Sequence, residues 1–245
     1  MEFYNEDCIT GAKKNLKDNT IDLMICDPPY GINGAKLDRH YNRDESNVLD
    51  GYVDVPENEY SDFSLKWIKE AERVLRPGGS FYIVSGYSNL HHVLNALKNT
   101  NLQEKNHIIW KYNFGVYTTK KYISSHYHIL YCTKKGSNVT FNKNAFHSDC
   151  EKAANGGSLN YRDREDVWII NREYKPGQIK NKNELPKSLL KKMILYSSNP
   201  NDWVCDFFLG SFSTAKVAIG LGRYACGFEI NKIAFDYQIE NMKHC

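Results

Sequence analysis

Near its carboxyl end the sequence reads Val204-Cys205-Asp206-Phe207-Phe208-Leu209-Gly210-Ser211-Phe212-Ser213-Thr214. This is an apolar run typical of a strand, followed by a turn of small residues and then by the start of a helical pattern. Such a turn lets a ligand approach the backbone closely, and the free N–H groups at the start of the helix favour an anionic group. The order of strand, turn and helix therefore predicts a ligand-binding βαβ unit.

The next apolar run adds an acid to this unit. It ends in Gly227-Phe228-Glu229-Ile230-Asn231, so Glu229 follows Gly210 by 19 residues. An acid about 20 residues beyond a glycine loop is the group that binds ribose hydroxyls in doubly wound α/β folds. The alternative is an ordinary βαβ unit in which Glu229 is a solvated strand end.

The rest of the chain shows the same alternation of strands and helices. Strands are predicted at 21–26, 80–85, 107–112, 127–133, 203–208 and 225–230, and helices at 63–75, 89–98, 186–196 and 214–221. Alternation of this kind is typical of a mostly parallel, doubly wound α/β sheet. No helical pattern separates 107–112 from 127–133, so these two strands are expected to pair antiparallel at one edge of the sheet.

The tetrapeptide Asp27-Pro28-Pro29-Tyr30 follows the first of these strands. Ligands bind at the carboxyl ends of parallel strands, so this motif is expected to face the same crevice as Gly210. The amino group of a nucleobase is a poor nucleophile because its lone pair is delocalised into the ring. The Asp27 carboxylate and the Pro28 carbonyl could each accept one of its N–H bonds and so free the lone pair. Tyr30 offers a face for stacking. A proline-rich turn with a core tyrosine is the alternative.

Composition excludes several classes of protein. The 245 residues are 41% hydrophobic, which is enough for a core and excludes wholesale disorder. No apolar run is long enough to cross a membrane, and the acidic N-terminus differs from a secretory signal. The seven cysteines form no Cys-x-x-Cys pair, which favours reduced thiols. We therefore expect a soluble, cytoplasmic protein.

The net charge of +3 is too small to indicate nucleic-acid binding by itself, but the charge is unevenly distributed. Segments 98–135 and 172–192 are basic, and they could supply phosphate contacts if they share a face. Two long segments fit no helix or strand pattern. We interpret 31–62 as a mobile loop after the catalytic motif and 136–182 as a small target-recognition insert within a single domain of residues 1–245.

These motifs together resemble the amino-group DNA methyltransferases that use S-adenosylmethionine, specifically their beta class. In that circularly permuted class the Asp-Pro-Pro-Tyr motif precedes the cofactor loop, as here. The resemblance extends to Asn5-Glu6-Asp7-Cys8, to 63–85, to the strand pair around Trp110 and Tyr127, and to 183–193. It implies a Rossmann-like methyltransferase sheet in which the strands before Asp27 and Asp206 are central neighbours.

The resemblance also implies site residues. The catalytic residues it implies are Asp27, Pro28, Pro29 and Tyr30. For the cofactor, S-adenosylmethionine, it implies Asp7, Cys8, Asn183, Leu185, Pro186, Asp206, Phe208, Gly210, Ser211, Phe212, Ser213, Thr214, Glu229 and Ile230, with no metal. Phe212 stands where the family has a glycine. It is expected to add bulk where the backbone approaches the cofactor, with a different local φ.

The implied activity is methyl transfer to the N6 amino group of adenine in duplex DNA, with the target base flipped out of the helix. N4 of cytosine is the alternative target, although cytosine enzymes more often carry serine at the position of Asp27. A non-catalytic DNA-binding or partner subunit, with Phe212 blocking the cofactor, is the alternative from another class. Beyond duplex DNA, the resemblance suggests a homodimer and a cognate restriction endonuclease as partners, and a prokaryotic, nucleoid-associated location.

Overall fold

The computed structural model describes residues 1–32, 54–113, 115, 117–136, 138–146, 152–157, 163–173 and 184–242. Its strands are β1 (Glu2–Tyr4), β2 (Ile21–Cys26), β3 (Leu75–Ser85), β4 (Leu102–Lys111), β5 (His126–Lys134), β6 (Val167–Ile169), β7 (Trp203–Asp206) and β8 (Tyr224–Phe228). Its helices are α1 (Cys8–Asn15), α2 (Tyr60–Val74), α3 (Leu90–Lys98), α5 (Lys187–Ser197), α6 (Ser213–Gly220) and α7 (Lys232–Met242), with a short 3₁₀ turn, η4 (Glu57–Glu59).

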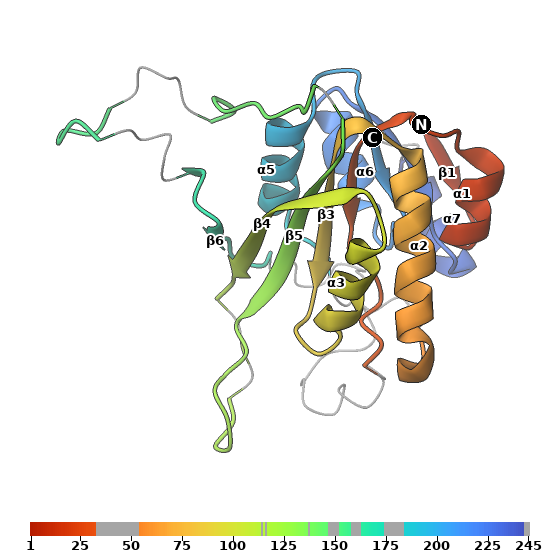
Figure 1. Ribbon diagram of the computed structural model, residues 1–245, viewed down its shortest axis with the longest axis horizontal. Coiled ribbons are helices and arrows are strands. Elements are labelled where there is room, and N and C mark those ends of the chain that lie inside the picture. Colours follow the sequence, from red (N-terminus) through yellow and green to blue (C-terminus); the bar gives the residue numbers. More distant parts are fainter. Residues whose placement is uncertain are drawn as a thin grey trace.

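The strands form one sheet in the order β1-β8-β7-β2-β3-β5-β4-β6 (Figure 1). The central strand β2 runs parallel to β3 on one side and to β7 on the other. This confirms the expectation that the strands before Asp27 and Asp206 are neighbours. Because parallel strands end at the same edge of a sheet, the two motifs leave the sheet side by side.

Helices cover both faces of this sheet. Side chains on α1, α2 and α3 pack with Met24 and Phe81 in one core cluster, whereas α5 and α6 pack with Leu23 and Tyr82 in the other (Figure 1). Successive residues of a strand point to opposite faces, so β2 is apolar along almost its whole length. The two-faced core confirms the predicted doubly wound α/β class.

Two details of the sheet differ from the sequence prediction. Strands β4 and β5 pair antiparallel as expected, but β6 adds in parallel outside β4, so the pair does not form the edge. The strand predicted at 80–85 begins earlier, at Leu75, and β3 includes Arg76–Gly79, where the pairing with β2 skips from Leu75 to Ser80. Gly78 has a φ of +76°, which a glycine adopts without strain, and the four residues form a bulge.

Several elements were not predicted from the sequence. These are β1, β6, α1 and α7, all short or weakly periodic, and α2 starts at Tyr60, inside the predicted loop 31–62. Most of that loop, residues 33–53, lies outside the described residues, as does much of the segment 136–182. No helix in the described part of the chain is long and apolar enough to cross a membrane.

Candidate active site

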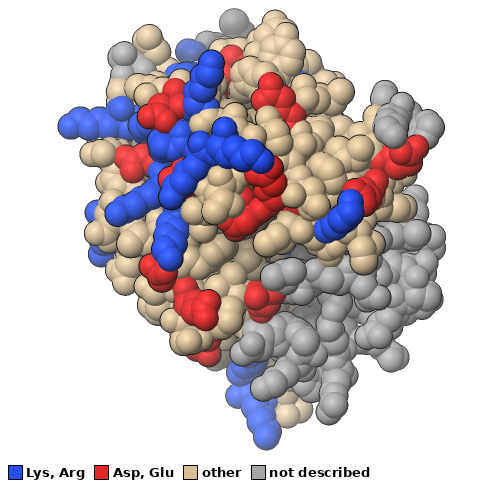
Figure 2. Space-filling view, turned by 90° about the vertical axis from the view of Figure 1, so that its right-hand side faces the viewer, with Lys and Arg blue, Asp and Glu red and all other residues tan. Residues whose placement is uncertain are grey.

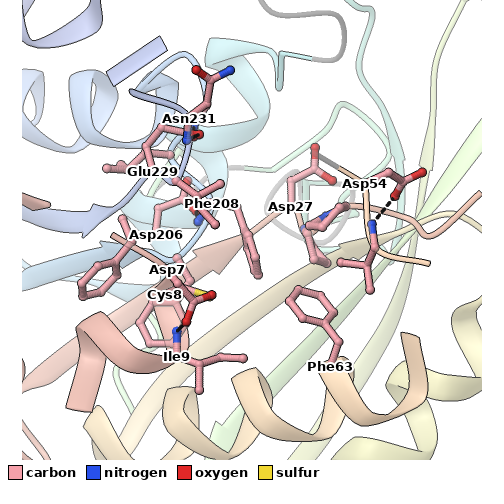
Figure 3. A pocket seen from close by; sticks show the side chains of 18 of the residues that line it. Asp7, Cys8, Ile9, Asp27, Asp54, Phe63, Asp206, Phe208, Glu229 and Asn231 are labelled. Carbon is pink, nitrogen blue, oxygen red and sulfur yellow. Dashed lines mark hydrogen bonds between the residues drawn. The ribbon is translucent and has the colours of Figure 1, made fainter. Parts of the chain in front are cut away.

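A cavity of about 670 Å³ opens at the carboxyl ends of β2, β7 and β8 (Figure 3). Asp7, Cys8, Glu229 and Asn231 lie on one side of it and Asp27 on the other, with Phe208 between them. Most of the predicted site residues line this cavity: Asp7, Cys8, Asp27, Pro28, Pro29, Tyr30, Leu185, Asp206, Phe208, Gly210, Ser211, Ser213, Thr214, Glu229 and Ile230. Pro186 and Phe212 do not, and Asn183 lies outside the described residues.

Asp27 is the acid at the end of β2. Its Oδ1 accepts a hydrogen bond of 2.6 Å from the Tyr30 hydroxyl, and within the described residues Oδ2 accepts none. The pKa of Asp27 is raised to about 7, mainly by burial and also by the Asp206 carboxylate, although Tyr30 and Arg172 oppose the shift. Burial also raises the pKa of Tyr30, so its hydroxyl stays protonated and remains a donor. The arrangement leaves Oδ2 able to accept a hydrogen bond from a ligand in the cavity.

Two side chains hold the backbone after Tyr30. The Asn89 amide donates to the carbonyls of Tyr30 and Gly31, at 2.7 and 3.2 Å. Asp54 accepts the Gly31 N–H at 2.9 Å. Sequence reasoning missed both residues. Asn89 directly precedes α3, where an asparagine reads as a helix cap, but its side chain makes no cap hydrogen bond. Its contact with the catalytic motif follows only from the tertiary fold.

The loop between β7 and α6 is tied to the end of β8 by acids. The Gly210 N–H donates to Glu229 Oε2 at 2.7 Å, and the Asn231 N–H donates to Glu229 Oε1 at 2.8 Å. Asp206 accepts the Phe208 N–H at 2.9 Å, which ends β7 two residues before the predicted boundary. Burial raises the pKa of Asp206 to about 7. The loop is thus preorganised, with Glu229 and Asp206 both facing the cavity.

Asp7 forms the wall opposite Asp27. Its Oδ1 caps α1 by accepting the backbone N–H groups of Ile9 and Thr10, at 3.1 and 3.0 Å. A carboxylate is favoured at this position, because the helix N-terminus carries partial positive charge. Every hydrogen bond that the Asp7 carboxylate accepts within the described residues ends at Oδ1, so Oδ2 is available to a ligand amino group.

The segment before α5 supplies an acid that the sequence analysis did not select. Glu184 lines the cavity beside Leu185, and its Oε1 accepts a hydrogen bond of 2.5 Å from the Ser213 hydroxyl. The Ser213 and Ser211 hydroxyls are 2.8 Å apart. Glu184 lies between Asn183 and Leu185, which the resemblance implied as cofactor contacts, but no pattern in the sequence marked Glu184 itself. The three side chains form a polar end of the cavity at the start of α6.

Phe212 does not enter the cavity, and the expectation that it crowds the cofactor is wrong. Its backbone has a φ of +59° and a ψ of +23°, the left-handed conformation that a glycine adopts readily. The side chain is fully buried on the far side, against the rings of Phe3 and Phe235, with centroids 5.0 and 5.9 Å away. Of the three residues from 210 to 212, only Gly210 and Ser211 line the cavity.

This placement predicts the effect of restoring glycine. Phe212→Gly relieves the left-handed strain, which costs roughly 1–2 kcal/mol, but loses ring burial that contributes roughly 3–5 kcal/mol. We expect the free energy of unfolding to fall by about 2 kcal/mol in urea denaturation. Affinity for S-adenosylmethionine, measured by calorimetry, should stay within about twofold. A large gain in affinity would instead mean that the phenylalanine blocks the cofactor site.

Arg172 lies next to the side of the cavity that contains Asp27 and Tyr30. Its guanidinium is 4.8 Å from the ring centroid of Tyr112 and 5.3 Å from that of Tyr127, and the Tyr127 ring is 5.6 Å from that of Tyr30. The sequence placed Arg172 in the recognition insert. In the structure it is enclosed by aromatic rings behind the catalytic motif, where its charge favours the ionised form of Asp27.

The family model of the N6- and N4-type enzymes, described as DNA methylase, matches residues 21–240. The type II methyltransferase M.HpaI of Haemophilus parainfluenzae is 32% identical over 228 residues, which cover 90% of this chain and 68% of that protein. The DNA adenine methyltransferase YhdJ of Escherichia coli K12 is 32% identical over 234 residues, which cover 89% of this chain and 74% of that protein.

Solved structures share the fold. The complex of M1.HpyAVI with S-adenosylmethionine gives a TM-score of 0.65 at 21% identity, covering 98% of this chain and 97% of that one. The cytosine-N4-specific PvuII DNA methyltransferase gives a TM-score of 0.70 at 16% identity, covering 96% and 85%. At these identities the likeness concerns the architecture, and it agrees with the predicted sheet.

Proposed function

The chain belongs to the DNA methylase family, and from this membership we propose that it methylates the N6 amino group of adenine in duplex DNA, with S-adenosylmethionine as the methyl donor. The observation that carries the proposal is the position of Asp27. It stands at the end of β2 and lines the same cavity as Asp206 and Glu229. One of its carboxylate oxygens accepts the Tyr30 hydroxyl, and within the described residues the other accepts no hydrogen bond.

The cavity residues fit the cofactor. An adenosyl group needs an acceptor for its amino group, acceptors for its ribose hydroxyls and an apolar surface for its ring. Asp7 offers the acceptor for the amino group, Glu229 the acceptors for the ribose hydroxyls and Phe208 the apolar surface for the ring. Glu184 and Ser213 offer an acid and a hydroxyl to the methionine end, with its ammonium group. S-Adenosylmethionine supplies an electrophilic methyl group on a sulfonium ion. The protein positions the base amine towards it.

On the target side, the chain's residues make the amine nucleophilic. Asp27 Oδ2 and the Pro28 carbonyl each accept one N–H of the base, and Tyr30 bounds the space for the ring. The base leaves the helix to reach them, at a cost of a few kcal/mol. Once the nitrogen carries a fourth bond it is strongly acidic, and its proton passes to Asp27 or to solvent. No proton needs to be removed before methyl transfer.

Asp27 also favours adenine over cytosine. The carboxylate accepts an N–H more strongly than the serine that is more frequent in N4-cytosine enzymes. YhdJ, named as a DNA adenine methyltransferase, is 32% identical to this chain, whereas the cytosine-N4-specific PvuII enzyme shares the fold at 16%. These two observations support adenine as the target.

Mass spectrometry of nucleosides tests the proposal. Unmethylated genomic DNA is incubated with the protein and S-adenosylmethionine, then digested. We expect N6-methyladenine, and sequencing of the modified sites gives the recognition sequence. N4-methylcytosine would keep the mechanism but change the target. The absence of any methylated base, with the cofactor shown to bind, would overturn the enzyme proposal in favour of a non-catalytic DNA-binding subunit.

The raised pKa of Asp27 predicts the pH dependence of the reaction. Only the carboxylate accepts the base N–H at Oδ2, so kcat/KM should fall as the pH drops through the pKa of about 7. Below it we expect a loss of about tenfold per pH unit, and above it a plateau. Cofactor affinity is measured over the same range, since Asp206 titrates in this window too. A rate that stays constant down to about pH 5 would contradict the assignment.

The remaining predictions concern the large substrate and partners. We also propose that residues 31–62 form a loop that closes over the flipped base and that 136–182 form a recognition insert. A homodimer and a cognate restriction endonuclease remain the proposed partners. Action on DNA would also place the protein at the bacterial nucleoid. Sedimentation of the protein with and without duplex DNA measures the oligomeric state directly.

A further inference from the structure

The hairpin turn that joins β4 to β5, described at residues 112, 113, 115 and 117–125, leaves the sheet at the edge that carries the cavity. Lys111 pairs with His126 at its base, and His128 pairs with Ser85 at the carboxyl end of β3. Strand β3 runs parallel to β2, whose end leads into Asp27. In Figure 1 this hairpin, in green, extends well beyond the end of the sheet. The hairpin therefore leaves the sheet at the same edge as the Asp27–Tyr30 motif.

The exposed part of the hairpin combines aromatic and basic side chains. Tyr122 is 99% exposed and Tyr117 is 78% exposed, and Lys120 and Lys121 stand exposed between them. The sequence from 112 to 125 contains two lysines and no acid. Tyrosine rings this exposed present an apolar face on which a ligand can stack. Stacking rings next to lysines are the groups that bind bases and phosphates.

The base of the hairpin is held by packing and by a backbone hydrogen bond. Tyr112 is buried, and its N–H donates to the Ser125 carbonyl at 3.0 Å. Its ring packs on those of Trp110 and Tyr127, with centroids 5.7 and 5.4 Å away, and Tyr127 packs on Tyr30. The tip therefore projects from the aromatic cluster that also supports the catalytic tyrosine.

A second basic surface lies on the outer sides of α1 and α2, but acids accompany it. Lys14 pairs with Glu6 at 2.7 Å and Arg73 with Asp18 at 2.6 Å. Figure 2, which views the molecule from this side, shows basic and acidic side chains next to one another. Ion pairs of this kind lower the attraction for a polyanion. The hairpin, in contrast, contains two lysines and no acid, and it leaves the sheet at the edge where the cavity lies.

We propose that residues 112–125 form a DNA-contacting arm, in which Lys120 and Lys121 bind backbone phosphates and Tyr122 stacks on a base or sugar near the flipped nucleotide. The proposal rests on the function proposed above and assigns the contact surface for its duplex substrate. It places this contact on the β4–β5 hairpin, in addition to the segment 136–182. The arm fixes the duplex relative to Asp27 through the shared aromatic base.

The test uses the full-length protein and a fluorescein-labelled duplex of mixed sequence, with anisotropy read at several salt concentrations. In the double variant Lys120→Ala/Lys121→Ala we expect duplex affinity to fall about tenfold, and the slope of log K against log salt to decrease by about two. Tyr122→Ala should lower affinity about tenfold, and Tyr122→Phe should retain it, since the ring stacks. Cofactor affinity should stay unchanged in all three.

Lys105→Ala is the matched control. Lys105 is exposed on the same strand β4, at the end away from the cavity, and it should leave duplex affinity unchanged. Wild-type affinity and salt slope in the double variant, with methylation intact, would overturn the arm and leave the proposed function standing. A changed oligomeric state without a change in DNA affinity would overturn it as well, in favour of a protein interface. A wild-type protein that neither binds nor methylates duplex DNA would overturn both proposals.

Discussion

Asp27→Ala is expected to lower the rate of methyl transfer by about a hundredfold to a thousandfold, the range seen when a preorganised polar group at a reacting centre is lost. The variant lacks the oxygen that accepts the base N–H, so the amine lone pair stays delocalised. Tyr30 loses its acceptor at the same time. Single-turnover methylation of duplex DNA, with tritiated S-adenosylmethionine, measures the effect on the transfer step.

Cofactor binding separates this effect from misfolding. Asp27 directly follows β2, whereas the loop that faces the cofactor is held by Glu229, so calorimetry should give an affinity for S-adenosylmethionine within about twofold of the wild type. Asp236→Ala removes an exposed acid on α7 and should leave the rate unchanged. If Asp27→Ala turned over at a near-normal rate, the assigned mechanism would be wrong.

Glu229→Ala is expected to have the second-largest effect, on cofactor affinity. The carboxylate accepts the N–H groups of Gly210 and Asn231 and faces the cavity, so its loss frees the loop and removes a ligand contact. Hydrogen bonds to a charged group contribute about 1.5–3 kcal/mol each. We expect the Kd for S-adenosylmethionine to rise about a hundredfold by calorimetry.

Glu229→Gln provides the matched variant. The glutamine side chain has the same shape and keeps one acceptor oxygen, so it should lose only about tenfold. Thermal melting without cofactor should show that both variants fold. An unchanged Kd in the folded Glu229→Ala variant would show that the cofactor lies elsewhere in the cavity.

The sequence was sufficient for the parts of the site that follow from local pattern. Three acids, Asp27, Asp206 and Glu229, each stand at the end of a buried apolar run that reads as a strand. The alternation of strands and helices brings the carboxyl ends of such strands together. The cavity therefore contains most of the predicted residues. Local pattern also predicted the antiparallel pairing of β4 and β5 correctly, from the missing helix between them.

Other features depend on contacts between distant residues. Asn89 and Asp54 meet the backbone of Gly31 only after α3 and the segment before α2 have packed. Phe212 looked like an obstacle because its sequence position shows its size but not its direction. A left-handed backbone turns the ring towards Phe3, away from the cavity. The strand β6 has three residues and no periodicity to detect.

The central place of β2 has a consequence for how the chain folds. β2 pairs with β3, which follows about 50 residues later, but Met24 meets Cys205 of β7 roughly 180 residues further along. During synthesis β2 can pair on one side long before its other partner has left the ribosome. Its second edge then stays open, which favours binding of chaperones or other strands. The two halves of the cavity are joined by this long-range pairing, which is among the slowest contacts to form.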